Sequence, residues 1–227
     1  MKIRQELRKM ENKGAKNTLY QAGDLEYFAQ GNYEGLIPSS HLKKFGDTGI
    51  GTFHCANGEM IVLEGVVYQA AWNGTVNIAD DMTTPLANVK FFNPEIKTEF
   101  SNVPHMDRLT EKLMEIADSH GTDLFYVAKI SGFFSAIQVR SAYPQTKPFK
   151  PLEILLETDE VQFDYENLSG TIIGLYCPES IGTLNHSGWH FHFISEDRKK
   201  GGHLLDAAFK KADVQVDFCH KFEVIAK

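Results

Sequence analysis

The sequence predicts an α+β fold: two packed, mostly antiparallel or mixed β-sheet sub-structures, one substantial amphipathic helix, and a metal site in the cleft between the sheets. Three observations predict it. Short apolar segments punctuated by glycine or asparagine recur along most of the chain, as in a strand-rich protein. Only residues 106–119 have the 3.6-residue period of a long helix. Three histidines, His190, His192 and His203, gather near the C-terminal end.

The N-terminal part is expected to change from a polar tail to ordered structure at Thr18. Residues 1–17 are polar and rich in lysine, and are expected to form an N-terminal extension. Ordered structure is expected to begin at residues 18–22. Asp24 then has the position of an N-cap for a short helix, and Ser39 begins a second short helix that Gly46 ends.

Strand signals dominate the next part of the chain. Residues 50–53, 59–63 and 66–72 are short, apolar segments that we interpret as strands. The dipeptides Asn57-Gly58 and Asn73-Gly74 are the strongest turn signals in the sequence, because both residue types tolerate the positive φ of tight hairpins. These strands are expected to pair as antiparallel neighbours.

The helix near residues 105–119 has its apolar side chains on one face, at Leu109, Leu113, Ile116 and Ala117, and Gly121 follows as a stop. Further strands are expected at residues 124–130, 133–142, 171–176, 189–194, 203–209 and 214–224.

Three prolines, at positions 144, 148 and 151, interrupt this series of strands. They suggest a boundary between an N-terminal β-rich sub-domain, residues 18–143, and a C-terminal β sub-domain, residues 144–227, that carries the histidines.

Composition excludes several classes of function. The formal net charge of −7 does not favour a nucleic-acid partner, which usually requires a basic patch. Cys55, Cys177 and Cys219 are widely spaced and form no CxxC pair, so we interpret them as reduced core thiols. No apolar stretch approaches the roughly 18 residues of a membrane span, and no secretory h-region follows the N-terminus. A cytoplasmic protein without a membrane partner is expected.

The segment Gly188-Trp189-His190-Phe191-His192-Phe193 alternates aromatic residues with histidine. In a strand this period of two places His190 and His192 on one face and the aromatic side chains on the other, toward the core. Residues 195–202 form a polar turn that ends in two glycines, so the chain is expected to return as a hairpin with His203 at the start of the next strand. Three imidazoles with an open fourth position are typical of catalytic zinc.

Two other interpretations remain open at this point. His190-x-His192-x3-Glu196 resembles half of a cupin motif, so a metal-dependent oxygenase or isomerase with Glu196 as a ligand is an alternative. The second is a non-enzymatic β-rich binding protein in which the metal braces a hairpin. The remaining histidines lack such spacing and are interpreted as surface or core residues, and only His186 is close enough in sequence to support the cluster.

Several further blocks carry a resemblance to a known family, in order along residues 18–224. They are Thr18–Gln21, Gly49–Phe53, Asn57–Met60 with Tyr68-Gln69, Phe125–Lys129, Val139-Arg140 with Pro144-Gln145, Gly170–Gly174, Gly188–Phe193 with Glu196-Asp197, and Gly201-Gly202-His203. Together they resemble the acetolactate decarboxylases, which are carboxy-lyases that convert 2-acetolactate to acetoin and carbon dioxide.

The resemblance implies a set of site residues and a cofactor. It implies zinc bound by His190, His192 and His203, a catalytic glutamate at Glu59, and an active-site arginine at Arg140 that binds the substrate. It implies a pocket threonine at Thr52. The substrate is an anionic keto acid, and a homodimer is expected. The family pattern continues into a C-terminal tail with a second glutamate, for which this sequence offers no candidate; Glu223 does not match.

The implied chemistry agrees with the residues. A 2-hydroxy-3-keto acid can chelate zinc through its hydroxyl and keto oxygens, and the metal then stabilises the enediolate as carbon dioxide leaves. The ketone is its own electron sink, and the sequence has no glycine-rich nucleotide loop. Arg140 is expected to act as an electrostatic clamp, while water or Glu59 relays the proton.

Overall fold

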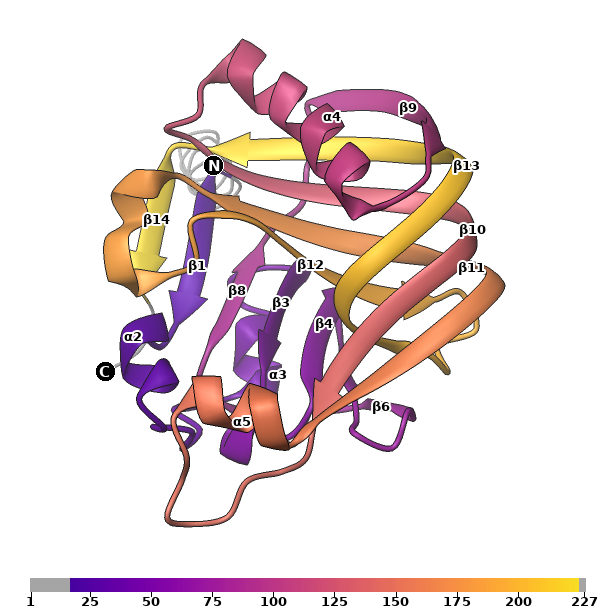
Figure 1. The fold of residues 1–227 in the computed structure, drawn as a ribbon. Helices are drawn as coiled ribbons and strands as arrows, with labels where there is room; N and C mark the ends of the chain where they lie inside the picture. Colours follow the sequence, from indigo (N-terminus) through magenta and orange to yellow (C-terminus); the bar gives the residue numbers. More distant parts are fainter. Residues whose placement is uncertain (1–16, 225–227) are drawn as a thin grey trace, which may run out of the picture.

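The computed structural model describes residues 17–224. The expected N-terminal extension, apart from Asn17, therefore lies outside the described residues. Within that range the protein is mostly β, with a few short helices around two large sheets (Figure 1). This agrees with the expected class in its high strand content and its single long helix.

The first sheet has seven strands among the described residues, and all its pairings are antiparallel except that between β1 and β14. In spatial order its strands are β14 (Lys221–Val224), β1 (Thr18–Ala22), β8 (Ala87–Lys90), β3 (Thr48–Thr52), β4 (Glu59–Leu63), β5 (Val66–Ala70) and β6 (Val76–Ile78). A separate small sheet pairs β2 (Ile37–Pro38) with β7 (Thr83–Thr84).

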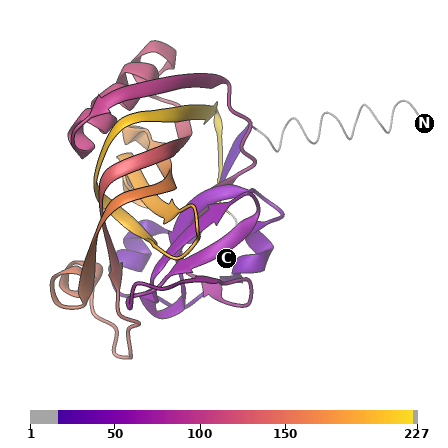
Figure 2. The same cartoon turned by 90° about the vertical axis from the view of Figure 1, so that its right-hand side faces the viewer.

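The second sheet is antiparallel and contains the longest strands. Its spatial order is β10 (Phe125–Ala142), β11 (Glu160–Cys177), β12 (Gly188–Ser195), β13 (Gly201–Cys219) and β9 (Ile96–Val103). Because β13 also pairs with β10, the strands β10 to β13 close on themselves, and the long strands curve strongly in two perpendicular views (Figures 1 and 2).

Four α-helices and two 3-10 helices connect these strands within the described part of the chain. They are α2 (Leu25–Ala29), α3 (Ser39–Leu42), α4 (Met106–His120), α5 (Leu152–Thr158), η1 (His54–Ala56) and η2 (Glu179–Leu184). Asp24 caps α2 as expected, since its side chain accepts a hydrogen bond from the Tyr27 backbone N–H. Gly121, with φ 129°, ends α4.

The structure corrects several expected elements. Two pairs of expected strands are single long strands, β10 and β13, and only the second half of β11 was expected. The strand expected at residues 214–224 is divided, because β14 leaves the second sheet to pair with β1 in the first. The strands β6, β8 and β9 and the helix α5 were not expected from the sequence.

The boundary expected at residue 144 does not separate the sheets. β9 and β10 precede that residue but pair with β13 and β11, which follow it. Conversely, β14 follows it but belongs to the first sheet. The proline-rich segment is instead a loop that joins β10 to α5 and returns the chain to β11, the neighbour of β10.

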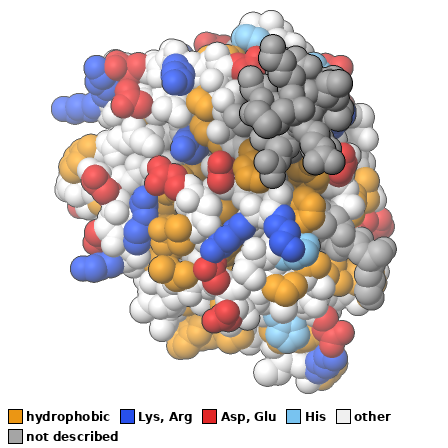
Figure 3. Space-filling view, turned by 180° about the vertical axis from the view of Figure 1, so that it is seen from behind, with side chains coloured by type: hydrophobic (Ala, Val, Ile, Leu, Met, Phe, Trp, Pro, Cys, Tyr) orange, Lys and Arg blue, Asp and Glu red, His pale blue; other side chains and the backbone are white. Residues whose placement is uncertain are grey.

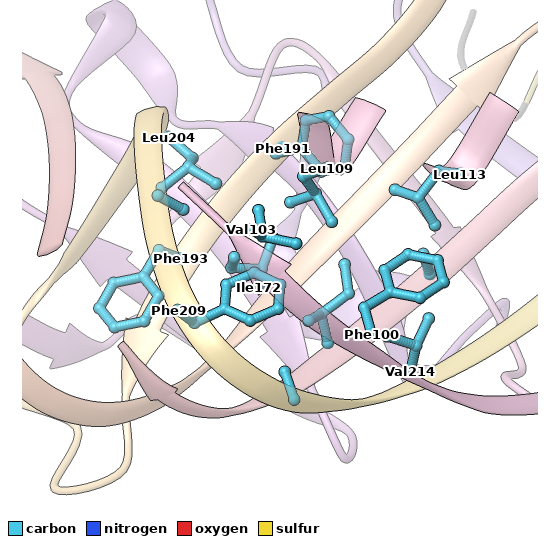
Figure 4. Close-up of a cluster of buried hydrophobic side chains, with 14 of the residues drawn as sticks. Phe100, Val103, Leu109, Leu113, Ile172, Phe191, Phe193, Leu204, Phe209 and Val214 are labelled. Carbon is cyan, nitrogen blue, oxygen red and sulfur yellow. The ribbon is translucent and has the colours of Figure 1, made fainter. Parts of the chain in front are cut away.

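Two apolar cores hold the layers together. The first lies between the sheets, where Ile50 and Ile61 from one sheet meet Val127, Ile173 and Ile194 from the other. The second lies on the opposite face of the second sheet, beneath α4, and includes Phe100 and Val103 from the edge strand β9. Figure 4 shows this second core, in which Leu109 and Leu113 from the helix form one cluster with Phe191, Phe193 and Ile172 from the sheet. The amphipathic period of α4 is therefore satisfied by packing on the sheet.

Alternate residues of β10 face this second core, but the set that faces it changes from even-numbered to odd-numbered residues along the strand. Tyr126, Ala128 and Ile130 are buried beneath α4, but farther along Ile137 and Val139 take that place. The change coincides with register shifts against β13 on either side of Phe134. An irregularity of this kind inserts a residue into the alternation and turns the following side chains to the other face. It leaves Arg140 on the face directed toward the first sheet.

Two findings concern the kinds of partner that were considered from the sequence, membranes and nucleic acids. Among residues 17–224, none of the helices has both the length and the apolar character needed to cross a bilayer. On the face seen from behind, lysine and arginine side chains lie among aspartate and glutamate rather than in one basic patch (Figure 3).

Candidate metal centre and active site

The three histidines predicted to cluster do lie together. His192 in β12 is directly opposite His203 in β13, at the start of the hairpin that the polar turn closes. His190 Nε2 lies 3.0 Å from His203 Nδ1 and 3.2 Å from His192 Nε2. Within residues 17–224 they form the one group of at least three metal-ligating side chains, with ligand atoms all within 4.8 Å of one another.

Alternation in β12 explains the convergence. Phe191 and Phe193 are buried beneath α4, so His190 and His192, which alternate with them, point to the opposite face, toward the first sheet. Ile194 joins the core between the sheets on this same side. The ring of His192 crosses that space, and its Nδ1 lies 2.8 Å from the backbone carbonyl oxygen of Met60 in β4.

The hydrogen-bond pattern fits a bound cation. His192 Nδ1 donates to Met60, so Nε2 of the neutral ring carries a lone pair. Arg140 Nη2 lies 3.3 Å from His203 Nε2, and His203 Nδ1 faces His190 Nε2 at 3.0 Å. With the protons of His190 and His203 on their other ring nitrogens, His190 Nε2 and His203 Nδ1 present lone pairs to the same space as His192 Nε2, which lies 3.2 Å from His190 Nε2.

A cation would remove this repulsion. In a tetrahedral site with metal–nitrogen bonds of about 2.0–2.1 Å, the ligand nitrogens stand roughly 3.3 Å apart, close to the 3.0 and 3.2 Å that separate His190 Nε2 from the other two ring nitrogens. Burial also lowers the pKa of all three rings, that of His192 to about 4, so they are neutral and able to ligate at pH 7. The residues present therefore fit a metal ion.

Glu59 and Arg140 approach the histidines from two different sheets. Glu59 is the first residue of β4, and its Oε2 lies 3.5 Å from His192 Nε2. Burial raises the pKa of Glu59 to about 7, although the nearby Arg140 lowers it. Arg140 lies opposite His203 in the pairing of β10 with β13. The expected residues thus lie around one space.

Thr52 also borders this space, at the end of β3 and opposite Glu59 in register. Its hydroxyl donates to the carbonyl oxygen of Gly58 at 2.8 Å. That bond braces the turn just before Glu59, while the hydroxyl oxygen of Thr52 can still accept a hydrogen bond from a ligand.

Glu160 was not anticipated from the sequence. Its Oε2 accepts a hydrogen bond from Arg140 Nη1 at 2.8 Å, and the two side chains are only 14% and 21% exposed. Glu160 begins β11 directly after α5, a helix that was itself missed, so local sequence patterns gave no reason to place it beside Arg140.

A cavity of about 460 Å³ joins these residues. It is bordered by all six expected site residues, Thr52, Glu59, Arg140, His190, His192 and His203. Leucines from two short helices form an apolar part of its wall, namely Leu25 in α2 and Leu152, Leu155 and Leu156 in α5. His186 also borders the cavity, with its ring centroid 6.4 Å from that of His190. Polar groups at one side and apolar groups at the other are typical of a small-molecule site.

Comparison with known proteins identifies the group to which this arrangement belongs. The family model described as alpha-acetolactate decarboxylase matches residues 19–226. The chain belongs to the alpha-acetolactate decarboxylase family. Its relatives include alpha-acetolactate decarboxylases from Methanosarcina mazei, 36% identical over 92% of this chain and 72% of the relative, and from Brevibacillus brevis, 33% identical over 94% and 74%.

Solved structures of the alpha-acetolactate decarboxylase family have the same fold. The crystal structure of alpha-acetolactate decarboxylase from Bacillus subtilis strain 168 superposes with a TM-score of 0.86 at 28% identity, covering 91% of this chain and 88% of that one. A Staphylococcus aureus protein described as similar to alpha-acetolactate decarboxylase gives 0.86 at 26% identity, covering 92% and 88%.

Membership of the alpha-acetolactate decarboxylase family confirms the expected resemblance and the expected enzyme class, a carboxy-lyase. It argues against both alternatives, the cupin-like oxygenase and the non-enzymatic binding protein. The geometry adds a second argument against the first of these. Glu196, its expected ligand, is exposed in the turn after β12 and is outside the metal-ligating group found in the described residues.

Proposed function

We propose that this protein decarboxylates 2-acetolactate to acetoin and carbon dioxide at a zinc ion bound by His190, His192 and His203. The observation that carries the proposal is the convergence of three neutral imidazoles, Arg140 and Glu59 on one cavity. Zinc held there would supply Lewis acidity to the hydroxyl and keto oxygens of the substrate. The remaining steps depend on residues of the chain.

Arg140 is the proposed binding residue for the substrate carboxylate. Its Nη1 is engaged by Glu160, but its Nε is buried and has no hydrogen-bond partner among the described residues. Nε and Nη2 lie on the same edge of the guanidinium and can donate side by side to one carboxylate. A substrate carboxylate would satisfy the unpaired Nε, whose isolation otherwise costs free energy.

Glu59 is the proposed proton donor. When the bond to carbon dioxide breaks, its electron pair moves into the neighbouring ketone, and the carbon that loses the carboxylate must accept a proton. With a pKa raised to about 7, the Glu59 carboxyl is protonated in a large fraction of molecules at neutral pH, as a general acid requires. Water then restores its proton.

The apolar wall from α2 and α5 would exclude water and hold the methyl groups of the substrate. Thr52 is proposed to accept a hydrogen bond from the substrate hydroxyl, and His186 is not assigned a chemical role. The homodimer and the cytoplasmic location remain predictions.

The test is an acetoin-release assay on the purified protein, with metal content measured on the same sample. We expect roughly one zinc per chain, acetoin and carbon dioxide in equal amounts, loss of turnover with a chelator, and recovery on addition of zinc. Bound iron with oxygen uptake would instead support the cupin-like alternative. Bound metal without turnover of 2-acetolactate would contradict the proposed function.

A further inference from the structure

The ion pair between Arg140 and Glu160 is held by the register of two long strands. In the antiparallel pairing of β10 with β11, Arg140 is opposite Gln162 and Ala142 is opposite Glu160. Glu160 is therefore the diagonal neighbour of Arg140 on the same sheet face, within reach of a long side chain. The ladder between these strands is unbroken from Ala136 to Ala142, so the diagonal contact has a rigid base.

Glu160 lies behind the arginine rather than in the cavity. Arg140 borders the cavity, whereas Glu160 does not. The second carboxylate oxygen of Glu160 accepts a hydrogen bond from Gln162 Nε2 at 2.6 Å. Both oxygens are thus engaged, one by the guanidinium and one by the neighbouring amide, which fixes the direction of the carboxylate.

This arrangement determines which edge of the guanidinium is left for a ligand. A guanidinium has five N–H donors in a fixed plane. With Nη1 held by Glu160, the edge formed by Nε and Nη2 remains, and its Nε has no partner among the described residues while Nη2 contacts His203 at 3.3 Å. Without Glu160, the guanidinium could turn toward Glu59, a second carboxylate that lies close enough to interact electrostatically with Arg140.

We propose that Glu160 is a positioning residue that anchors Nη1 of Arg140 and thereby directs the Nε and Nη2 edge toward the carboxylate of the substrate. The inference rests on the proposed function, because it assigns Glu160 a part in binding the same keto acid. Glu160 itself does not touch the substrate.

The experiment compares Glu160→Ala and Glu160→Gln in the full, metal-loaded protein by steady-state kinetics with 2-acetolactate. For Glu160→Ala we expect KM to rise about tenfold or more with a smaller fall in kcat, and zinc content to be unchanged. Glu160→Gln should recover most of the loss, because the new amide oxygen can accept from Nη1 while the amide of Gln162 turns its oxygen toward the new NH2 group.

A control removes an ion pair with the same diagonal register between residues that do not border the cavity. Lys211 and Glu99 are 2.6 Å apart and are diagonal neighbours in the pairing of β13 with β9, where Lys211 is opposite Ser101 and Asp213 is opposite Glu99. Glu99→Ala should leave KM and kcat at the wild-type values. A rise of KM in this control equal to that in Glu160→Ala would overturn the inference, since it would reflect a general weakening of the sheet.

A double-mutant cycle tests whether Glu160 acts through Arg140. If it does, Glu160→Ala should change KM strongly in the wild-type background and by less than about twofold in the Arg140→Ala background. Equal effects in both backgrounds would overturn the inference, as would wild-type kinetics of Glu160→Ala. Failure of the proposed function is a separate result, because the wild-type protein itself would then release no acetoin.

Discussion

His192 Nδ1 lies 2.8 Å from the carbonyl oxygen of Met60, a hydrogen bond that joins the second sheet to the first. It fixes the tautomer of the ring and directs the lone pair of Nε2 toward His190 and Glu59. The packing of the two sheets therefore prepares this ligand before any ion is bound.

His192→Ala should remove both the bound metal and the decarboxylase activity, because two imidazoles hold zinc far less tightly than three. Metal content and acetoin release measure the two effects. Since His192 is 1% exposed, circular dichroism and the less disruptive His192→Gln should be included. His120→Ala, at the exposed end of α4, is the control and should leave both unchanged. Normal turnover in His192→Ala would refute the metal assignment.

Arg140→Lys should lower kcat/KM about a hundredfold, equivalent to about 2.7 kcal/mol of transition-state stabilisation. Lysine keeps the positive charge beside Glu160 but offers no planar edge with two parallel donors. Zinc content should be unchanged, because Arg140 contacts His203 without being a ligand. A kcat/KM within threefold of the wild-type value would show that a positive charge at position 140 is enough, without the planar guanidinium edge.

Glu59→Gln should change how the stability of the metal-free protein depends on pH. The folded carboxyl binds a proton below about pH 7, whereas the ordinary value of 4.5 applies to the unfolded chain. Between these values only the folded state of the wild type holds the extra proton, so the contribution of Glu59 to stability is present below pH 4.5 and is lost as pH rises through 7.

The measurement is urea denaturation of both proteins at pH 5 and at pH 7.5. The free energy of unfolding of wild type minus that of Glu59→Gln should fall with rising pH, by up to roughly 3 kcal/mol. A difference that does not change between the two pH values would show that the carboxyl is not perturbed by its surroundings.

Gly202→Ala should displace the third histidine. A Cβ at Gly202 would stand 2.6 Å from the carbonyl oxygen of Arg140, so β13 must move away from β10 just before His203. We expect lower zinc affinity and a loss of stability of several kcal/mol. Gly65→Ala, in a turn with φ +75° and no atom within 4 Å of the new Cβ, should cost only about 1 kcal/mol of backbone strain and leave zinc binding intact. Equal zinc affinity in both variants would exclude a steric effect on the site.

Much of the site was predictable because its signals are local. The alternation around His190 and His192 predicts one strand face, and the polar turn ending in two glycines predicts that His203 returns beside them. The strand at residues 59–63 and the helix cap at Asp24 are likewise short-range patterns that the structure confirms. Glu59, Arg140 and Thr52 were different, since only resemblance to a family singled them out.

The sequence by itself determined the high strand content, the single long helix and the shared face of the histidines, because each depends on the period of a few neighbouring residues. The tertiary structure alone decided that Arg140 faces the histidines. In an unbroken alternation it would share the face of Tyr126 and Ile130, beneath α4, and the irregularities around Phe134 reverse that facing. It also decided that Glu160 anchors Arg140, since the register of two long strands, rather than any local pattern, brings residues 20 positions apart into contact.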